Sequence, residues 1–223
     1  MFDEVAGRYD VINDVLSLGL DRWWRRRAIG ALGSAPEDWA LDLGCGTGGL
    51  TFLLSRKTRV VGVDVSAAML QHAERAARGT VRLVQGSAFR LPFRDGVFGN
   101  VASAFVLRNL DDLPAAFAEL ARVTSPSGNI ALLDATEPRG RVFRRLFDAY
   151  FTTVAPLLGR LAGRPDAYRY LAGSLGQIPP PPEVCRLLRQ AGFGRCQARP
   201  LTLGAVVLFT ATRTPIKEST DPP

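Results

Sequence analysis

The chain has 223 residues, of which 47% are hydrophobic and 22% are charged, and this composition is typical of one globular domain with a large core. No stretch of eighteen apolar residues lacks a charge, and Met1 to Glu4 are acidic where a secretory signal would be basic, so the sequence predicts neither a membrane span nor export. The net charge of +7 comes almost entirely from arginine, which either reflects coding composition or indicates an anionic partner such as nucleic acid, lipid headgroups or an acidic ligand.

The pattern of apolar residues changes at Trp39. Before it, residues 9–32 predict two short helices separated by Gly19. After it, compact apolar runs alternate with helical periodicity, which is typical of a parallel sheet with helices on both faces. The strands predicted here are residues 39–43, 60–65, 81–85, 98–104 and 129–135, with helices between the first three and before the fifth.

The last third of the chain predicts a different arrangement. Helical patterns cover residues 141–161 and, after a run of four prolines, residues 183–191. Two consecutive strands follow at residues 194–199 and 205–213, with a loop between them. We expect these two strands to form an antiparallel hairpin at one edge of a mostly parallel, seven-stranded α/β sheet.

Cysteine usage bears on compartment and metal binding. The three cysteines, Cys45, Cys185 and Cys196, cannot all pair, and none lies in a CxxC or Cys/His spacing. We therefore expect a reducing compartment, most simply the cytoplasm, with neither a structural disulfide nor a metal site.

A glycine-rich loop follows the first predicted strand, where the chain turns into a helix. Glycines there let the backbone approach a ligand and adopt angles that other residues disfavour. Gly44, Gly46 and Gly49 match the spacing GxGxxG, which is also the pattern of a dinucleotide site. The loop thus predicts a nucleotide-containing cofactor, and either NAD or S-adenosylmethionine would fit it.

Two carboxylates flank this loop. Asp42 lies two residues before Gly44, where it would repel a pyrophosphate but would pair with the cationic amino acid end of S-adenosylmethionine. Its alternative role is to cap the loop amides. Asp64, twenty residues after Gly44, can accept both ribose hydroxyls of either cofactor. Together the two carboxylates favour S-adenosylmethionine.

Four segments in order carry a family resemblance. They read YDVINDVLSLG at residues 9–19, LDLGCGTG at 41–48, FVLRNL at 105–110 and YRYLAGS at 168–174. The second resembles class I S-adenosylmethionine methyltransferases in general. All four together, with Arg22 and Trp24, resemble the ubiquinone/menaquinone biosynthesis C-methyltransferases (UbiE/MenG type) over nearly the whole chain.

Some positions depart from that family pattern. They are Asp21 for histidine, Ser87 for an acidic or amide residue at the adenine edge, Gly99 for aspartate, Ala104 for serine and Asp134 for glutamate. None of these changes removes the donor site. Together they leave the identity of the acceptor open.

The resemblance implies a single class I methyltransferase domain over residues 1–213, with helices at 1–32 and an insertion at about 139–175 covering the acceptor, and a frayed tail at 214–223. It implies S-adenosylmethionine as cofactor, S-adenosylhomocysteine as product, and a ring carbon of a lipophilic polyprenyl quinol, demethylmenaquinol first, as acceptor. A paralogue acting on another phenolic or isoprenoid molecule is the alternative. The donor-binding residues implied are Asp42, Gly44, Gly46, Thr47, Gly48, Asp64, Val65, Met69, Ser87, Ala88 and Ala104.

The expected catalytic residues are Arg108 and Asn109, just beyond the fourth predicted strand. Carbon is a poor nucleophile unless a neighbouring hydroxyl ionises, as in a reduced quinol, whose phenolic pKa is about 10. A guanidinium there would stabilise the phenolate or orient a water that takes the proton. The alternative is an ion pair of Arg108 with Asp111 or Asp112 in the same loop.

Two other residue types are candidates for the acceptor side. Tyr168, with Tyr170, would either stack on the quinol ring, as a third catalytic residue, or pack its own helix. His72, the only histidine, is expected on the surface of the helix after Asp64, away from the acceptor.

Two basic clusters beside apolar residues predict contact with an anionic membrane. Arg25 to Arg27 follow Trp23 and Trp24, and four arginines at residues 139–145 precede an apolar helix that either covers the acceptor or packs in the core. The expected location is the cytoplasm, peripheral at the inner face of the membrane. Both a monomer and a homodimer fit the sequence.

Other functions fit less of the sequence. An NAD-dependent oxidoreductase would share the glycines but lacks a recognisable proton relay. A nucleic-acid methyltransferase would explain the charge, but residues 103–106 read SAFV where methylation of base amino groups favours Asn/Asp-Pro-Pro-aromatic, so no nucleic-acid partner is expected. A noncatalytic lipid-associated scaffold would differ from an enzyme in its affinity for the methyl donor.

Overall fold

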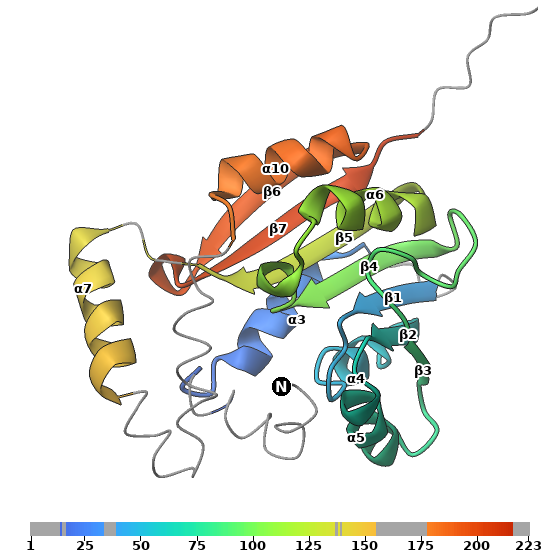
Figure 1. Ribbon diagram of the computed structural model, residues 1–223, viewed down its shortest axis with the longest axis horizontal. Helices are drawn as coiled ribbons and strands as arrows, with labels where there is room; N and C mark the ends of the chain where they lie inside the picture. The colour runs from blue at the N-terminus through green and yellow to red at the C-terminus, as the bar shows by residue number, and fades with distance from the viewer. Residues whose placement is uncertain are drawn as a thin grey trace, which may run out of the picture.

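The computed structural model describes residues 14, 17–33, 39–136, 138, 140–154 and 178–215. Within these residues seven strands form one sheet in the order β3-β2-β1-β4-β5-β7-β6 (Figure 1). The strands are β1 (Trp39–Leu43), β2 (Arg59–Asp64), β3 (Arg82–Gln85), β4 (Phe98–Ala104), β5 (Thr124–Ala135), β6 (Phe193–Leu201) and β7 (Val206–Arg213). Neighbours pair in parallel except β5 with β7 and β7 with β6, which confirms the predicted fold class and its antiparallel edge hairpin.

Helices cover both faces of this sheet. They are α3 (Asp21–Ala31), α4 (Thr51–Leu54), α5 (Ala67–Ala77), α6 (Leu113–Val123) and α10 (Pro181–Gln190). Figure 1 shows α6 and α10 on one face, whereas α3 and α4 pack on the other. β1 is buried on both sides, as is typical of a strand in a parallel sheet. Leu41 and Leu43 belong to the core beneath α6 and α10, and Ala40 belongs to the core beneath α3.

Three predicted boundaries shift for local reasons. β5 begins five residues earlier than predicted, because Thr124 already pairs with Phe98 of β4 before the register shifts. α10 begins within the proline run, at Pro181, since proline is well accommodated in the first turn of a helix. Pro200, predicted in a loop, belongs to β6, which lies at the edge of the sheet where a missing N–H is tolerated.

Two predicted helical regions are described only in part. Gly19 has a φ of 75° two residues before α3 begins, which confirms the predicted break, while residues 1–13, 15 and 16 lie outside the described ranges. The helix predicted at 141–161 is seen as α7 (Arg141–Ala149) followed by a π-helix, η3 (Tyr150–Val154), and the remainder lies outside the described residues. Across the described ranges, every helix is too short or too polar to cross a membrane.

The prediction of no structural disulfide is wrong. Cys185 of α10 and Cys196 of β6 are disulfide-bonded, with their Cα atoms 5.6 Å apart. α10 packs directly against β6 and brings the two residues within the span of a disulfide, a contact that their separation in sequence did not reveal. Cys45 is the free, buried cysteine. Because two of the three cysteines are paired, cysteine usage no longer supports the expectation of a reducing compartment.

Candidate active site

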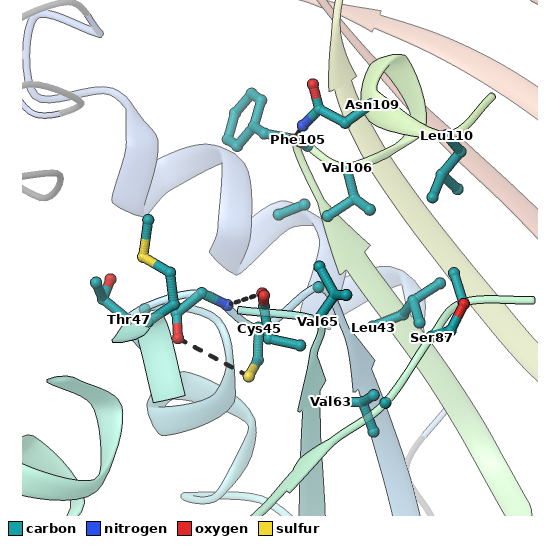
Figure 2. A pocket seen from close by; sticks show the side chains of 18 of the residues that line it. Leu43, Cys45, Thr47, Val63, Val65, Ser87, Phe105, Val106, Asn109 and Leu110 are labelled. Atoms are coloured by element: carbon teal, nitrogen blue, oxygen red, sulfur yellow. Dashed lines mark hydrogen bonds between the residues drawn. The ribbon is translucent and has the colours of Figure 1, made fainter. Parts of the chain in front are cut away.

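A cavity lies at the carboxyl ends of β1, β2, β3 and β4, where the loops after these neighbouring parallel strands meet. Figure 2 shows side chains from several of these loops around it. The described lining residues are Arg25, Leu43, Gly44, Cys45, Gly46, Thr47, Gly49, Val63, Asp64, Val65, Met69, Gly86, Ser87, Ala88, Phe89, Ala104, Phe105, Val106, Asn109 and Leu110. The strand order places the β3 loop on one side of Asp64 and the β1 and β4 loops on the other.

Two glycines shape the loop after β1. Gly44 has a φ of 67°, and a Cβ there would collide with the side chain of Val106, so glycine allows the β1 and β4 loops to approach each other. Gly46 has a φ of 54°, and a Cβ there would meet no atom of the described residues within 4 Å. Because Gly46 lines the cavity, a side chain at this position would occupy space that is left open for a ligand.

Asp64 joins the end of β2 to the glycine loop. Its Oδ2 accepts a hydrogen bond from the Gly46 N–H at 2.8 Å, and its Oδ1 accepts one from the Ser66 N–H at 2.9 Å. A carboxylate oxygen has two lone pairs, so both oxygens can also accept hydroxyls of a ligand in the cavity. The residue predicted to bind the ribose therefore lies in the cavity wall with a fixed orientation.

Asp42 lies outside the cavity lining. Asp42 is 1% exposed, and its Oδ2 accepts a hydrogen bond from the Thr51 hydroxyl of α4 at 2.6 Å, while its Oδ1 has no hydrogen-bond partner among the described residues. Burial raises the pKa of Asp42 to about 7, against the opposing effect of the Thr51 hydrogen bond. The structure thus gives Asp42 a contact with α4 that neither sequence interpretation included.

Phe105 marks the carboxyl end of β4. Its φ of 65° is uncommon for a residue with a side chain, and its N–H donates to the Leu133 carbonyl of β5 at 2.7 Å. The guanidinium carbons of Arg25 and Arg108 lie 5.6 and 5.7 Å from the centroid of its ring. A strained backbone at this point directs an aromatic ring to the edge of the cavity, near two cations.

Arg108 forms a buried ion pair. Its Nη1 donates to Asp134 Oδ1 at 2.5 Å and its backbone N–H donates to Asp134 Oδ2 at 3.3 Å, while its Nε meets no hydrogen-bond partner in the part of the chain that the structure describes. Full burial raises the pKa of Asp134, and the adjacent guanidinium counteracts that rise. The partner of Arg108 is Asp134 at the end of β5, instead of Asp111 or Asp112. Arg108 itself lies outside the cavity lining.

The structure brings most of the predicted site residues together. The cavity lining includes Gly44, Gly46, Thr47, Asp64, Val65, Met69, Ser87, Ala88, Ala104 and Asn109. Asp42, Gly48 and Arg108 lie outside it, and a Cβ on Gly48 would overlap the Phe52 ring, so packing explains that glycine. Tyr168 and Tyr170 lie outside the described residues. His72 lies half-buried on α5, away from the lining.

Several lining residues were missed by the sequence analysis. Phe105, Val106 and Leu110 belong to the FVLRNL segment, whose position after β4 could have indicated them. Arg25 was grouped with the membrane cluster, and only the packing of α3 brings it to the cavity. Trp24 from the same cluster is buried, and its Nε1 donates to the Thr202 hydroxyl at 2.7 Å. In the part of the chain that is described, no three His, Cys, Asp or Glu side chains gather as a metal site would require.

Comparison with known proteins decides the family. A family model described as the ubiE/COQ5 methyltransferase family matches residues 1–213. The chain belongs to this family. A relative from Beutenbergia cavernae, named demethylmenaquinone methyltransferase, is 40% identical over 215 residues, covering 96% of this chain and 89% of that protein. Relatives of the same name from Mycobacterium sp. (strain KMS) and Streptomyces avermitilis are 41% and 39% identical, over 96% and 93% of this chain and 93% and 90% of those proteins.

Solved structures agree with the fold of this family member. A SAM-dependent methyltransferase from Aquifex aeolicus superposes with a TM-score of 0.61 at 18% identity, covering 84% of this chain and 88% of that one. A phosphoethanolamine N-methyltransferase of Haemonchus contortus, in complex with S-adenosyl-L-methionine, gives a TM-score of 0.64 at 13% identity over 85% of this chain and 52% of that one.

Family membership decides between the two cofactors that the glycine loop allowed. A methyltransferase of this family takes its methyl group from S-adenosylmethionine, and the residues present fit that donor. Asp64 offers a carboxylate for the ribose, Gly46 leaves open space beside it, and Val65, Met69 and Ala88 give an apolar surface for a base.

Proposed function

We propose that this protein transfers a methyl group from S-adenosylmethionine to a ring carbon of a reduced polyprenyl quinol, with demethylmenaquinol as the acceptor and menaquinol as the product. The observation that carries the proposal is the identity of about 40%, over nearly the full length of both chains, to relatives named demethylmenaquinone methyltransferase. The cavity at the ends of β1 to β4 supports it, because residues suited to the donor line it.

The residues of this chain divide the chemistry between them. Bound S-adenosylmethionine supplies an electrophilic methyl group, and the protein must align the acceptor carbon with it and exclude water. Arg108 follows β4 and lies just outside the lining of the donor cavity, and we assign it the role of stabilising the quinol phenolate or orienting a water that accepts its proton. Asn109 contacts the acceptor from the cavity wall. Asp134 holds the Arg108 guanidinium in place through the buried ion pair. Tyr168 is proposed to stack on the quinol ring.

The decisive test of this function is a turnover assay. The protein is incubated with methyl-labelled donor and a panel of quinones, each supplied oxidised and dithionite-reduced, and the products are identified by mass spectrometry. Only reduced naphthoquinols are expected to gain a ring methyl group, at a rate that rises as the pH approaches the quinol pKa. Equal methylation of oxidised and reduced forms would contradict the mechanism. Preference for an unrelated phenol would indicate a paralogous activity.

We also propose that the protein contacts an anionic membrane, where a lipid-tailed acceptor resides. Leu18 is 71% exposed and Trp23 is 40% exposed, with Arg27 stacked over the Trp23 ring at 5.1 Å. Arg144 and Arg145 are exposed on α7 beside exposed Phe143. Apolar side chains mixed with arginines suit weak binding to anionic headgroups.

Charge reversal tests this membrane contact. Each arginine near an anionic surface contributes about 1 kcal/mol, so replacing Arg27 and Arg145 by glutamate should weaken sedimentation with anionic vesicles at least tenfold. Turnover of a short-tailed, soluble quinol should stay unchanged. Equal and salt-independent binding to anionic and neutral vesicles, or binding to neither, would contradict the proposal.

A further inference from the structure

Arg25 of α3 lies where two cavities meet. It lines the donor cavity, and it also lines a second cavity that includes Arg26 and Arg56; Thr47 and Gly49 belong to both. Among the described residues that line the donor cavity, Arg25 is the only cationic side chain. The position of this cation therefore bears on which part of the donor faces it.

The strand order orients the donor in the cavity. Asp64, the carboxylate expected to bind the ribose, lies between the β3 loop with Ala88 and the β1 loop with Thr47. The base and the amino acid end of the donor leave the ribose on opposite sides. The β3 side is apolar apart from Ser87 and suits the base, which leaves the glycine loop and Arg25 on the side of the charged amino acid end.

The guanidinium of Arg25 is held in one orientation. Its Nε donates to Asp21 Oδ2 at 2.7 Å, one helical turn away, and the two side chains are only 11% and 14% exposed. Its guanidinium carbon lies 3.5 Å from the position that a Cβ would take on Gly49, so it rests against the backbone of the glycine loop. An arginine that is already oriented and partly shielded from water binds a carboxylate strongly.

We propose that Arg25 binds the carboxylate at the amino acid end of S-adenosylmethionine and that Asp21 is the positioning residue that orients it. This proposal rests on the donor assignment above. Asp21 stands where the family resemblance expects histidine, so the Asp21–Arg25 pair is a property of this chain.

Calorimetric titration with three matched ligands tests the proposal. They are S-adenosylhomocysteine, its decarboxylated counterpart, which keeps the ammonium, and 5′-methylthioadenosine, which lacks the whole amino acid end. The native protein should bind S-adenosylhomocysteine at least about tenfold more tightly than the decarboxylated ligand. Arg25→Gln should reduce that preference to near unity without changing the affinity for methylthioadenosine. Arg26→Gln, which removes a neighbouring charge from the same helix, should keep it.

Each result has a defined meaning. A full preference in Arg25→Gln, or no preference in the native protein, would overturn the role of Arg25. If Arg25→Gln also loses methylthioadenosine binding, Arg25→Lys is the variant to use. A reduced preference for S-adenosylhomocysteine in Arg25→Lys would support the proposal, since a lysine cannot reproduce the planar contact. A full native preference in Arg25→Lys would overturn the proposal. Asp21→Asn should reduce the preference by a smaller factor than Arg25→Gln, and an unchanged preference would remove Asp21 from the proposal. If the native protein bound none of the three ligands, that result would instead contradict the donor assignment.

Discussion

The donor half, which is the part of the site formed by the glycine loop and the end of β2, and the neighbouring ends of β4 and β5 hold their charged groups in different ways. In the donor half, Asp64 is half-buried and its carboxylate accepts hydrogen bonds from backbone amides of Gly46 and Ser66. At the ends of β4 and β5, outside the cavity lining, Asp134 is fully buried and faces the guanidinium of Arg108. The first carboxylate is open to a ligand, whereas the second is committed to an internal partner.

Because of this difference, substitutions at the two carboxylates should affect different properties of the protein. Removing a half-buried carboxylate that accepts hydrogen bonds from backbone amides leaves amide groups that water can still reach. The removal should therefore lower ligand affinity more than stability. Removing one member of a buried ion pair leaves the other charge without compensation, which is strongly destabilising. We therefore expect substitutions in the donor half to affect affinity and substitutions at the β4–β5 end to affect both folding and turnover.

The largest effect is expected from Asp134→Asn. The change leaves the buried Arg108 guanidinium without its counter-charge, and it should lower the free energy of unfolding by about 3 to 5 kcal/mol, measured by denaturant titration. Turnover should fall even under conditions where the variant is folded, because the guanidinium is no longer fixed. Asp134→Glu, which keeps the charge, is the matched control and should retain more stability and activity than the asparagine variant. Wild-type stability in Asp134→Asn would show that the pair contributes little.

Asp42, in β1 and outside the cavity lining, differs from Asp64 because it is fully buried. Its pKa rises from 3.8 to about 7 on folding, so the folded state binds the proton more tightly than the unfolded state does. The protonated carboxyl therefore favours folding below about pH 4, and this contribution is lost as the pH rises through 7. Asp42→Asn stays neutral throughout, so it should gain stability relative to the native protein between pH 4 and 7, by up to about 4 kcal/mol. Denaturant titrations at several pH values measure the difference, and a pH-independent difference would contradict the burial effect.

The same contrast explains what the sequence could reveal. The donor half is built from short loops after consecutive strands, so its glycines, Asp64 and Ser87 lie in local motifs and were predicted as site residues. The strands themselves were predictable because apolar runs of five to seven residues alternate with helices, and the parallel sheet follows from that alternation.

The other features depend on contacts between distant parts of the chain. Arg25 and Phe105 are 80 positions apart, and Arg108 meets Asp134 only because β4 and β5 are neighbouring strands with matching carboxyl ends. The disulfide likewise requires α10 to pack on β6. The sequence shows where each arginine lies along the chain, but the packing of helices and strands decides whether its side chain faces a cavity, a carboxylate or solvent.

The third prediction concerns the open carboxylate of the donor half. Asp64→Ala removes the acceptor for the ribose hydroxyls and for the Gly46 N–H. Each of these hydrogen bonds is worth about 1.5 to 3 kcal/mol, because the acceptor is charged. Donor affinity, measured by calorimetry, should fall at least tenfold, while the free energy of unfolding should change less than in Asp134→Asn. Unchanged donor affinity in the variant, or tighter binding of NAD than of S-adenosylmethionine by the native protein, would contradict the cofactor assignment.

The smallest effect is expected from Gly46→Ala, which probes the same loop through its backbone. An alanine at a φ of 54° should cost about 1 to 2 kcal/mol of unfolding free energy. Its Cβ, with no atom of the described ranges within 4 Å, would enter the space of the donor and lower donor affinity as well. Gly30→Ala is the matched control: Gly30 lies in α3, and a Cβ there also meets no atom within 4 Å. That substitution should leave donor affinity unchanged and raise stability by up to about 1 kcal/mol, because alanine favours the helix. A Gly46→Ala variant that loses stability but keeps native donor affinity would show that the donor does not contact this part of the loop, and the orientation assigned to the donor half would then be wrong.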